Sequence, residues 1–173
     1  MDPHQRYNLA SILNAMNIED DIIRESFITI REHQMEMVNV IHGVSYINDS
    51  RSTNVRCLWN ALEQMYNGRT VLLMGGVDRG QNDYTSMDLP ALMKEKVKCI
   101  ISICDNPKPI IKAYKGIVPQ FLIAHDMDEA VGAAYRVATK GDTVLMSPAC
   151  ASFDWFENFM ERGKAFKKAV KKI

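Results

Sequence analysis

The sequence predicts an α/β domain with a doubly wound, mostly parallel sheet. Short apolar segments of strand length alternate with amphipathic segments of helical period, as parallel sheets covered by helices require. Loops rich in Gly, Ser, Asn and Asp follow several of the apolar segments. In this class of fold, functional groups gather beyond the carboxyl ends of the strands. We therefore expect a functional site in those loops.

The predicted elements of this sheet begin with a β-hairpin. It places Met35–Val40 before a His42-Gly43 turn and Val44–Ile47 after it, because the apolar period changes there. Helices and strands then alternate, starting with a helix: Asn54–Tyr66, Thr70–Met74, Leu89–Lys96, Val97–Ile103, Pro107–Tyr114, Gln120–Ile123, Met127–Thr139, Thr143–Met146 and Trp155–Val170.

Residues 1–31 are predicted to be a helical tail that belongs to a preceding domain. Tyr7–Met16 and Glu19–Ile30 carry apolar residues at helical spacing, but such a pair of helices is too small to fold alone. The α/β domain is therefore expected to cover residues 32–173.

Composition bounds the classes of function. The 173 residues contain 21 Lys plus Arg and 21 Asp plus Glu, so no overall charge attracts nucleic acid or an anionic membrane. The apolar runs are far below the roughly 20 residues that span a bilayer, and the first residues lack the apolar core of a signal peptide. We expect a monomeric cytoplasmic protein without nucleic-acid or membrane partners.

The four cysteines are expected to be reduced thiols of the core. Cys57, Cys99, Cys104 and Cys150 form no C-x-x-C pair, and no histidine lies at zinc-ligand spacing from them. Cys150 also has no assignable histidine that would activate it as a nucleophile.

The first candidate loop, YINDSRSTN, covers Tyr46–Asn54 and ends at a predicted helix start. Free backbone N–H groups at a helix start favour phosphate, and Arg51 adds one positive charge. However, Ser, Thr, Asn and Asp are also the usual residues that cap helices. On the residues alone, the cap is the favoured interpretation and the phosphate site is the alternative.

The second candidate loop, MGGVDRG, covers Met74–Gly80. Gly75 and Gly76 permit close approach of the backbone to another group, and Arg79 could bind a carboxylate with two hydrogen bonds. The loop matches neither G-x-G-x-x-G nor G-x-x-x-x-G-K-[ST]. By itself, it indicates a glycine turn with a solvated arginine.

The third candidate loop, SPACASFDWFENF, covers Ser147–Phe159. Ser152 is expected just before the last helix, where it could bind an anion beside an aromatic wall. The alternative is that the aromatic residues form the core face of that helix, as expected for at least two of Phe153, Trp155, Phe156 and Phe159.

In this order and at these separations, the three loops resemble those of the Mur ligase family, in its D-glutamate-adding branch. The most specific segment is SPACASFDWFENFMERGKAF, and YINDSRSTN is similar to the family's N-D-S-K-A-T-N. DPHQRYNLAS, near the start, resembles the G-x-H-N-x-x-N-x-x-A segment that ends the central ATPase domain. The resemblance covers nearly the whole chain and implies the C-terminal part of a longer enzyme, with a Rossmann-like domain.

The resemblance implies two groups of binding residues. Those on the nucleotide side are Asn8, Asp49, Arg51 and Thr53. Those that hold the incoming D-glutamate are Arg79, Ser152 and Phe159.

The resemblance also implies the reaction and its participants. The complete enzyme would use ATP and Mg²⁺ to join D-glutamate to UDP-N-acetylmuramoyl-L-alanine, which the upstream domains would bind. No catalytic residue, metal site or tightly bound cofactor is expected in this part, which would be inactive alone.

Several positions depart from the family pattern. Arg51 and Arg79 replace lysines, His33-Gln34 replaces a His-Arg pair, His4-Gln5 replaces a His-Asn pair, and Gln81 lengthens the glycine loop. Arginine keeps the charge of lysine but not its shape, and Gln34 removes a charge. We therefore expect the family's D-glutamate-binding residues to be retained in this sequence more than its nucleotide-binding residues.

Two other interpretations remain open. The string CDNPKP, Cys104–Pro109, resembles the D-N-P-R signature of the sister ligase that adds a diamino acid, but it lacks the arginine. The chain could also be a free-standing Rossmann-like binding or regulatory module that lacks ligase activity.

Overall fold

The structure is a computed structural model that describes residues 32–173 except 79 and 81. The described strands form one sheet with the order β1-β2-β6-β3-β4-β5. β1 (Glu36–Ile41) runs antiparallel to β2 (Val44–Asn48). The remaining neighbours are parallel to each other, namely β2, β6 (Thr143–Met146), β3 (Thr70–Met74), β4 (Val97–Ser102) and β5 (Gln120–Ile123). The predicted mostly parallel sheet is confirmed.

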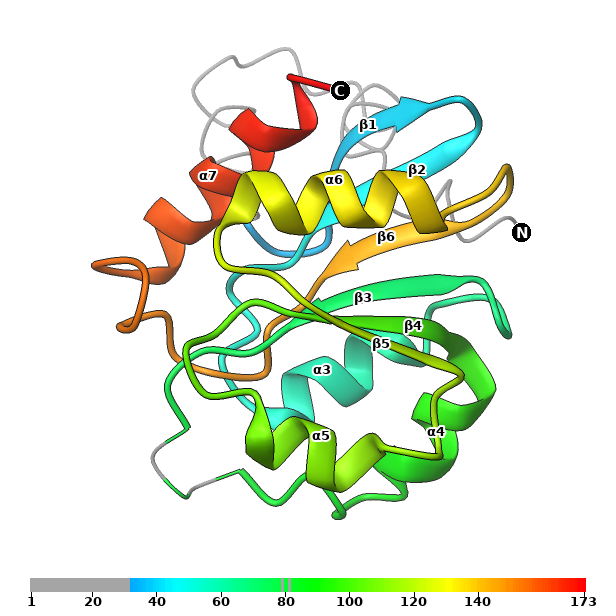
Figure 1. Cartoon of the computed structure of the whole chain (residues 1–173), viewed down its shortest axis with the longest axis vertical. Helices are drawn as coiled ribbons and strands as arrows, with labels where there is room; N and C mark the ends of the chain where they lie inside the picture. The colour runs from blue at the N-terminus through cyan, green and yellow to red at the C-terminus, as the bar shows by residue number, and fades with distance from the viewer. Residues whose placement is uncertain (1–31, 79, 81) are drawn as a thin grey trace, which may run out of the picture.

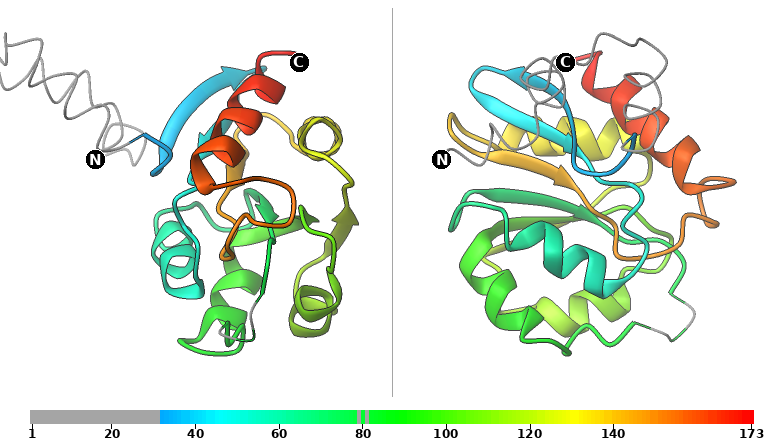
Figure 2. Two further views of the ribbon diagram at one scale, coloured as in Figure 1. Left: turned by 90° about the vertical axis from the view of Figure 1, so that its left-hand side faces the viewer. Right: turned by 180° about the vertical axis from the view of Figure 1, so that it is seen from behind.

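Helices cover both faces of this sheet. One face carries α3 (Val55–Leu62), α4 (Leu89–Lys96) and α5 (Lys108–Tyr114), and the other carries α6 (Met127–Val137) and α7 (Phe159–Val170). Figure 1 shows these two helical layers below and above the sheet, and the rear view in Figure 2 shows the same arrangement. The doubly wound α/β architecture predicted from the sequence is therefore confirmed.

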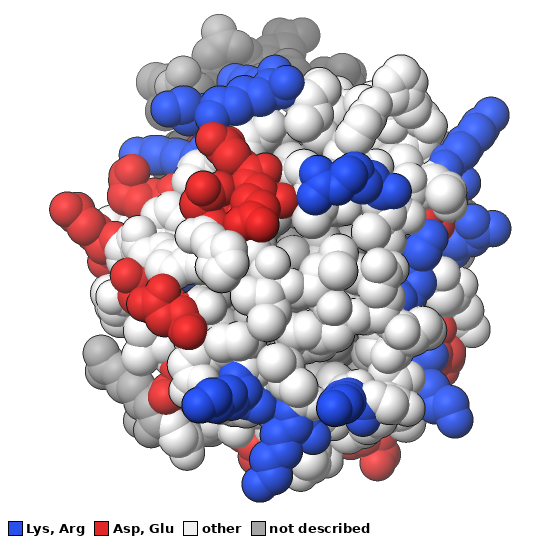
Figure 3. Space-filling model, viewed as in Figure 1, with Lys and Arg blue, Asp and Glu red and all other residues white. Residues whose placement is uncertain are grey.

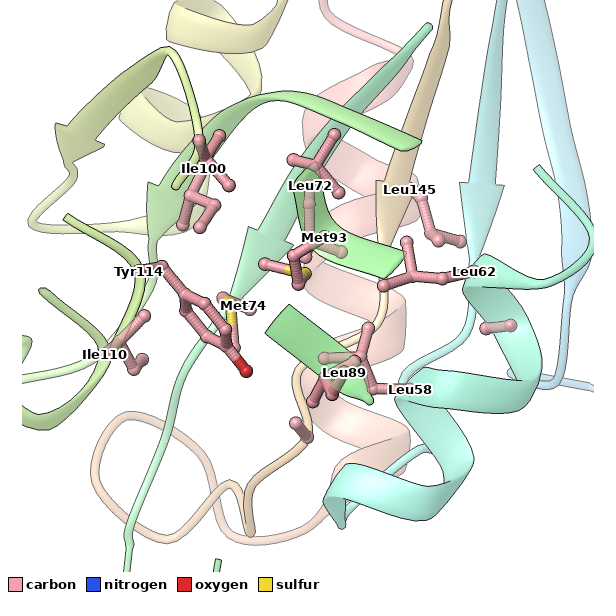
Figure 4. Packing of buried hydrophobic residues seen from close by; sticks show 14 of the residues in the cluster. Leu58, Leu62, Leu72, Met74, Leu89, Met93, Ile100, Ile110, Tyr114 and Leu145 are labelled. Carbon is pink, nitrogen blue, oxygen red and sulfur yellow. The ribbon is translucent and has the colours of Figure 1, made fainter. Parts of the chain in front are cut away.

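The central strands β2, β6, β3 and β4 are largely buried on both faces because their residues alternate between two cores. In β3, Leu72 and Met74 join the core under α3, α4 and α5, whereas Val71 and Leu73 join the core under α6 and α7. Figure 4 shows Leu72 and Met74 packed among side chains from the three helices of the first core. Continuous apolar strands are what a sheet covered on both faces requires.

The predicted hairpin is present, and its turn explains the pairing. Ile41 pairs with Val44, so His42 and Gly43 are the two turn residues, with φ angles of 50° and 78°. Two-residue turns with positive φ match the twist of the flanking strands.

Some predicted boundaries were wrong. The last helix begins at Phe159 rather than Trp155, because the Asn158 side chain accepts a hydrogen bond from the Glu161 N–H and caps it there. The helix predicted over 54–66 ends at Leu62, since the next hydrogen bonds join residues three apart. α6 ends at Val137 because Ala138 is extended, and β4 ends at Ser102.

The helices predicted over Tyr7–Met16 and Glu19–Ile30, and Asn8 within the first, lie outside the described residues. The domain boundary at residues 31 and 32 stays a prediction.

The surface carries both signs of charge. On the face in Figure 3, acidic side chains gather near the start of α6, where Asp126, Asp128 and Glu129 are exposed, and basic side chains are spread around them. Within the part of the chain that the structure describes, no helix is long and apolar enough to cross a membrane.

Candidate functional site

The three candidate loops lie next to one another at the carboxyl edge of the sheet. They follow β2, β3 and β6, and β6 lies between β2 and β3 in the sheet. Because these strands are parallel, their carboxyl ends open on the same edge. The strand order thus brings together loops that are separated in the sequence.

Hydrogen bonds tie the first loop to the third. The Ser147 hydroxyl donates to the Asp49 carboxylate over 2.7 Å, and the Ala149 N–H donates to the Ser52 carbonyl over 3.0 Å. Ser52 also donates from its hydroxyl to Asp49. The loop with the predicted nucleotide residues and the loop with the predicted D-glutamate residues are therefore one connected structure.

The glycine pair ties the second loop to the third. The Gly75 N–H donates to the Pro148 carbonyl over 2.9 Å, and the Val77 N–H donates to the Ala151 carbonyl over 2.8 Å. Gly76 has a φ of 147°, and a Cβ built on it would lie 2.1 Å from the Ala151 oxygen. Only glycine permits this approach. Arg79, the predicted D-glutamate ligand in this loop, lies outside the described residues.

Asp49 is buried at the centre of these contacts. Its carboxylate accepts hydrogen bonds from Ser52, from Ser147 and, over 3.1 Å, from the Met35 N–H. Burial raises the pKa of Asp49 to about 6, although the three hydrogen bonds favour the ionised form. In the described structure, Asp49 thus holds the first loop in place.

The other predicted nucleotide residues of this loop are on the surface. Arg51 and Thr53 are exposed, and the Arg51 N–H donates to the His33 carbonyl over 2.9 Å. The helix cap favoured from the residues alone is present: Asn54 accepts a hydrogen bond from the Cys57 N–H. Asn54 therefore caps α3, and the side chains of Arg51 and Thr53 do not.

A pocket of about 230 Å³ opens beside the first loop. Asp49 and Arg51 line it together with Asn60 of α3 and with Gln64, which follows that helix. Gln34, the position that loses the family's charge, also faces this pocket. Two of the predicted nucleotide residues and two of the departures from the family pattern therefore meet in one cavity.

The position of Ser152 in the third loop differs from the expectation. Ser152 is buried, but it does not lie at a helix start, because α7 begins seven residues later at Phe159. Phe159 is partly buried in the first turn of α7. Its ring packs edge-on against the His33 ring, with 6.3 Å between the ring centroids. Helix-terminal N–H groups of α7 therefore do not support anion binding by Ser152.

The aromatic residues before Phe159 are not on the last helix, so the core-face expectation was wrong in that form. Phe153, Trp155 and Phe156 lie in the loop, and Phe153 is 59% exposed. Trp155 and Phe156 pack against the core under α6 and α7, and the Trp155 indole N–H donates to Asp105 over 2.7 Å. The loop is therefore anchored by its aromatic residues.

Cys150 is part of the packing of this site. Its sulfur contacts the Tyr84 hydroxyl at 3.1 Å and the Asn82 amide at 3.4 Å. Burial raises the pKa of Cys150 to about 11, so the thiol is protonated near neutral pH and is a poor nucleophile.

A buried arginine that sequence reasoning missed joins the first and third loops. Arg162 of α7 donates to the Ser50 hydroxyl, the Ser50 carbonyl and the Cys150 carbonyl over 3.0, 2.9 and 3.0 Å. The Ser50 hydroxyl in turn donates to the Phe159 carbonyl over 2.7 Å. The sequence did contain an indication that Arg162 is buried. It recurs at helical spacing with Phe159, Phe166 and Val170, which places it on the side of α7 that faces the core.

His33 was also missed as a structural element of the site. It is buried, and the Asn48 amide donates to its Nδ1 over 2.8 Å, so this nitrogen carries no proton. Burial lowers the pKa of His33, and the nearby Lys167 ammonium lowers it further. A neutral His33 thus joins the segment before β1 to β2 and to Phe159.

The His33 ring fits against α7 only because residue 163 is glycine. A Cβ at Gly163 would lie 2.1 Å from His33 Nδ1. We expect Gly163→Ala to lower the free energy of unfolding by about 1–3 kcal/mol, as overpacked cores do. Gly132→Ala in α6 is the matched control, since its nearest neighbour is the flexible end of Arg136 at 3.6 Å. The control should gain roughly 0.5–1 kcal/mol. Equal gains for both variants in urea unfolding would contradict the packing.

Comparison with known proteins identifies the family. The model for the family "Mur ligase, glutamate ligase domain" matches residues 33–150, which is most of the chain. This chain belongs to the Mur ligase family.

Curated relatives within the Mur ligase family are named UDP-N-acetylmuramoylalanine--D-glutamate ligase. The protein from Porphyromonas gingivalis is 42% identical over 172 residues, which cover 96% of this chain and 37% of that protein. The protein from Christiangramia forsetii is 46% identical over 160 residues, covering 91% of this chain and 35% of that protein. The chain thus spans little more than a third of the length of these relatives.

Solved structures of other Mur ligases share the fold. The MurF ligase from Thermotoga maritima in complex with ADP matches with a TM-score of 0.52 at 14% identity, covering 94% of this chain and 36% of that one. The UDP-N-acetylmuramate-alanine ligase MurC from the same organism matches with a TM-score of 0.51 at 11% identity, with the same coverages. At these identities, the comparison supports the fold alone.

Proposed function

We propose that this chain is the amino-acid-positioning part of an ATP-dependent ligase that adds D-glutamate to UDP-N-acetylmuramoyl-L-alanine. The observation that carries the proposal is the direct connection between the loops, above all the Ser147–Asp49 hydrogen bond. It joins the loop with the predicted D-glutamate residues to the loop with the predicted nucleotide residues. The names of the curated relatives support D-glutamate as the amino acid.

The proposed task of the site is to orient D-glutamate without acid–base chemistry. D-glutamate carries two carboxylates, which a guanidinium such as Arg79 and a hydroxyl such as Ser152 can bind, while Phe159 contributes an apolar wall. In the complete enzyme, ATP would phosphorylate the alanine carboxylate and release ADP. The D-glutamate amine would then attack this acyl phosphate, forming the amide and releasing phosphate. Positioning the amine accelerates that attack.

The nucleotide would lie on the side of Asp49, Arg51 and Thr53, and the pocket beside the first loop supports that side. The UDP-sugar substrate would bind mainly to upstream domains. Within the described residues, no group of three His, Cys, Asp or Glu side chains could hold a metal ion. We place the reaction in the cytoplasm, with a monomeric enzyme, and expect the isolated chain to be inactive.

The competing proposal is a binding or regulatory module without ligase activity. It is favoured by Gln34, which faces the candidate nucleotide pocket without the family's charge. The upstream reading frame distinguishes the two proposals. A continuous frame that contains a G-K-[ST] phosphate loop supports the ligase, whereas an independent start at Met1 supports the module.

Ser152→Ala tests the D-glutamate site in the complete enzyme. We expect KM for D-glutamate to rise about fivefold to tenfold, which corresponds to the loss of one hydrogen bond of roughly 1–1.5 kcal/mol. KM for ATP should change little. Ser86→Ala, in a loop beyond the glycine pair, is the control for the same atomic change. Unchanged kinetics with D-glutamate would remove Ser152 from the site.

A further inference from the structure

We propose that Arg162 is a positioning residue whose buried charge holds the nucleotide loop and the D-glutamate loop in one reactive arrangement. This inference rests on the proposed ligase function. The D-glutamate loop is the third candidate loop, Ser147–Phe159, and the nucleotide loop is the first, Tyr46–Asn54.

The geometry of Arg162 is that of a clamp. Its side chain is 1% exposed, and all three guanidinium nitrogens donate hydrogen bonds within the protein. Two bonds reach Ser50, which stands between Asp49 and Arg51, and one reaches Cys150, two residues before Ser152. Arg162 therefore touches both loops directly, beside residues predicted to contact each substrate.

The clamp also reaches Phe159. The Ser50 hydroxyl receives the Arg162 Nε–H and donates its own proton to the Phe159 carbonyl. A displacement of the nucleotide loop at Ser50 would thus also displace Phe159, which is predicted to contact D-glutamate. Two separate connections, through Cys150 and through Phe159, carry the same coupling.

Among the described residues, Arg162 forms no ion pair with a carboxylate. Burial lowers the pKa of Arg162 to about 10, so the guanidinium remains charged near neutral pH. The hydrogen-bond acceptors of Arg162 are all neutral, although the Asp154 carboxylate raises its pKa. Burying a charge in such surroundings is unfavourable for folding. At the edge where an amino acid with two carboxylates and phosphate groups are proposed to bind, the same charge favours anionic substrates.

Kinetics of the complete enzyme test this proposal. Arg162→Lys keeps a charge, whereas Arg162→Met gives an unbranched, shorter side chain without charge or hydrogen bonds. We expect Met to raise KM for D-glutamate at least tenfold and KM for ATP at least threefold, and Lys to restore a large part of both. Arg136→Met on the exposed surface of α6 is the control and should leave both values unchanged.

Ser50→Ala keeps the proposal testable if Arg162→Met does not fold. It removes the link to Phe159 while leaving the Arg162 charge, and we expect KM for both substrates to rise about threefold. Unchanged KM values in Ser50→Ala, or equal effects of Lys and Met at position 162, would overturn the proposal. A wild-type enzyme with no D-glutamate-dependent activity would instead refute the proposed function.

Discussion

Gly76→Ala is expected to lower kcat/KM for D-glutamate about a hundredfold in the complete enzyme, because small displacements of positioning groups have effects of that size. The new Cβ would lie 2.1 Å from the Ala151 oxygen, and Cys150 Cβ would be 3.0 Å away. The loop with Ser152 must then move away from the glycine loop, and the Val77–Ala151 hydrogen bond is broken. The φ of 147° adds backbone strain for any L residue.

Gly116→Ala separates the loss of loop contact from general backbone strain. Gly116 also has a positive φ, at 83°, but nothing lies within 4 Å of a Cβ at that position. We expect this control to lose roughly 1–3 kcal/mol of stability and to keep its KM for D-glutamate. The close packing of the two loops would be refuted as a requirement if Gly76→Ala retained wild-type kinetics.

Arg79→Ala is expected to raise KM for D-glutamate roughly tenfold to a hundredfold, because hydrogen bonds to charged groups contribute about 1.5–3 kcal/mol. The proposed partner is a substrate carboxylate, so KM for ATP should rise much less. Arg79→Lys restores the residue of the family pattern and is the matched control. It should recover most of the affinity for D-glutamate. A defect confined to ATP would assign Arg79 to the nucleotide instead.

The strands could be predicted from the sequence because parallel strands buried on both faces are continuous apolar runs. Thr70–Met74 and Thr143–Met146, which are buried along their whole length, were predicted with the bounds that the structure has. The same is true of the edge strand Gln120–Ile123, although it is only partly buried. The start of the last helix could not be predicted as well. The spacing of the aromatic residues from Trp155 to Phe159 is compatible with a helix, but packing of Trp155 and Phe156 against the core and the Asn158 cap place the start later.

The site was predictable only in part. Strand-end loops mark where a site lies in this class of fold, but the contacts among them depend on the order of strands in the sheet. Arg162 and His33 were missed because their partners, Ser50 and Asn48, lie 112 and 15 residues away. The sequence also could not show that the Asp49 carboxylate is engaged by Ser52, Ser147 and the Met35 N–H.

The central claim is tested most directly by phosphate release from the complete enzyme. The assay contains ATP, Mg²⁺, UDP-N-acetylmuramoyl-L-alanine and one amino acid, which is D-glutamate, L-glutamate or a diamino acid. We predict phosphate release that requires both the UDP-sugar substrate and D-glutamate, with little release for the other amino acids. Release with a diamino acid but not with D-glutamate, or no release with any of them, would contradict the account.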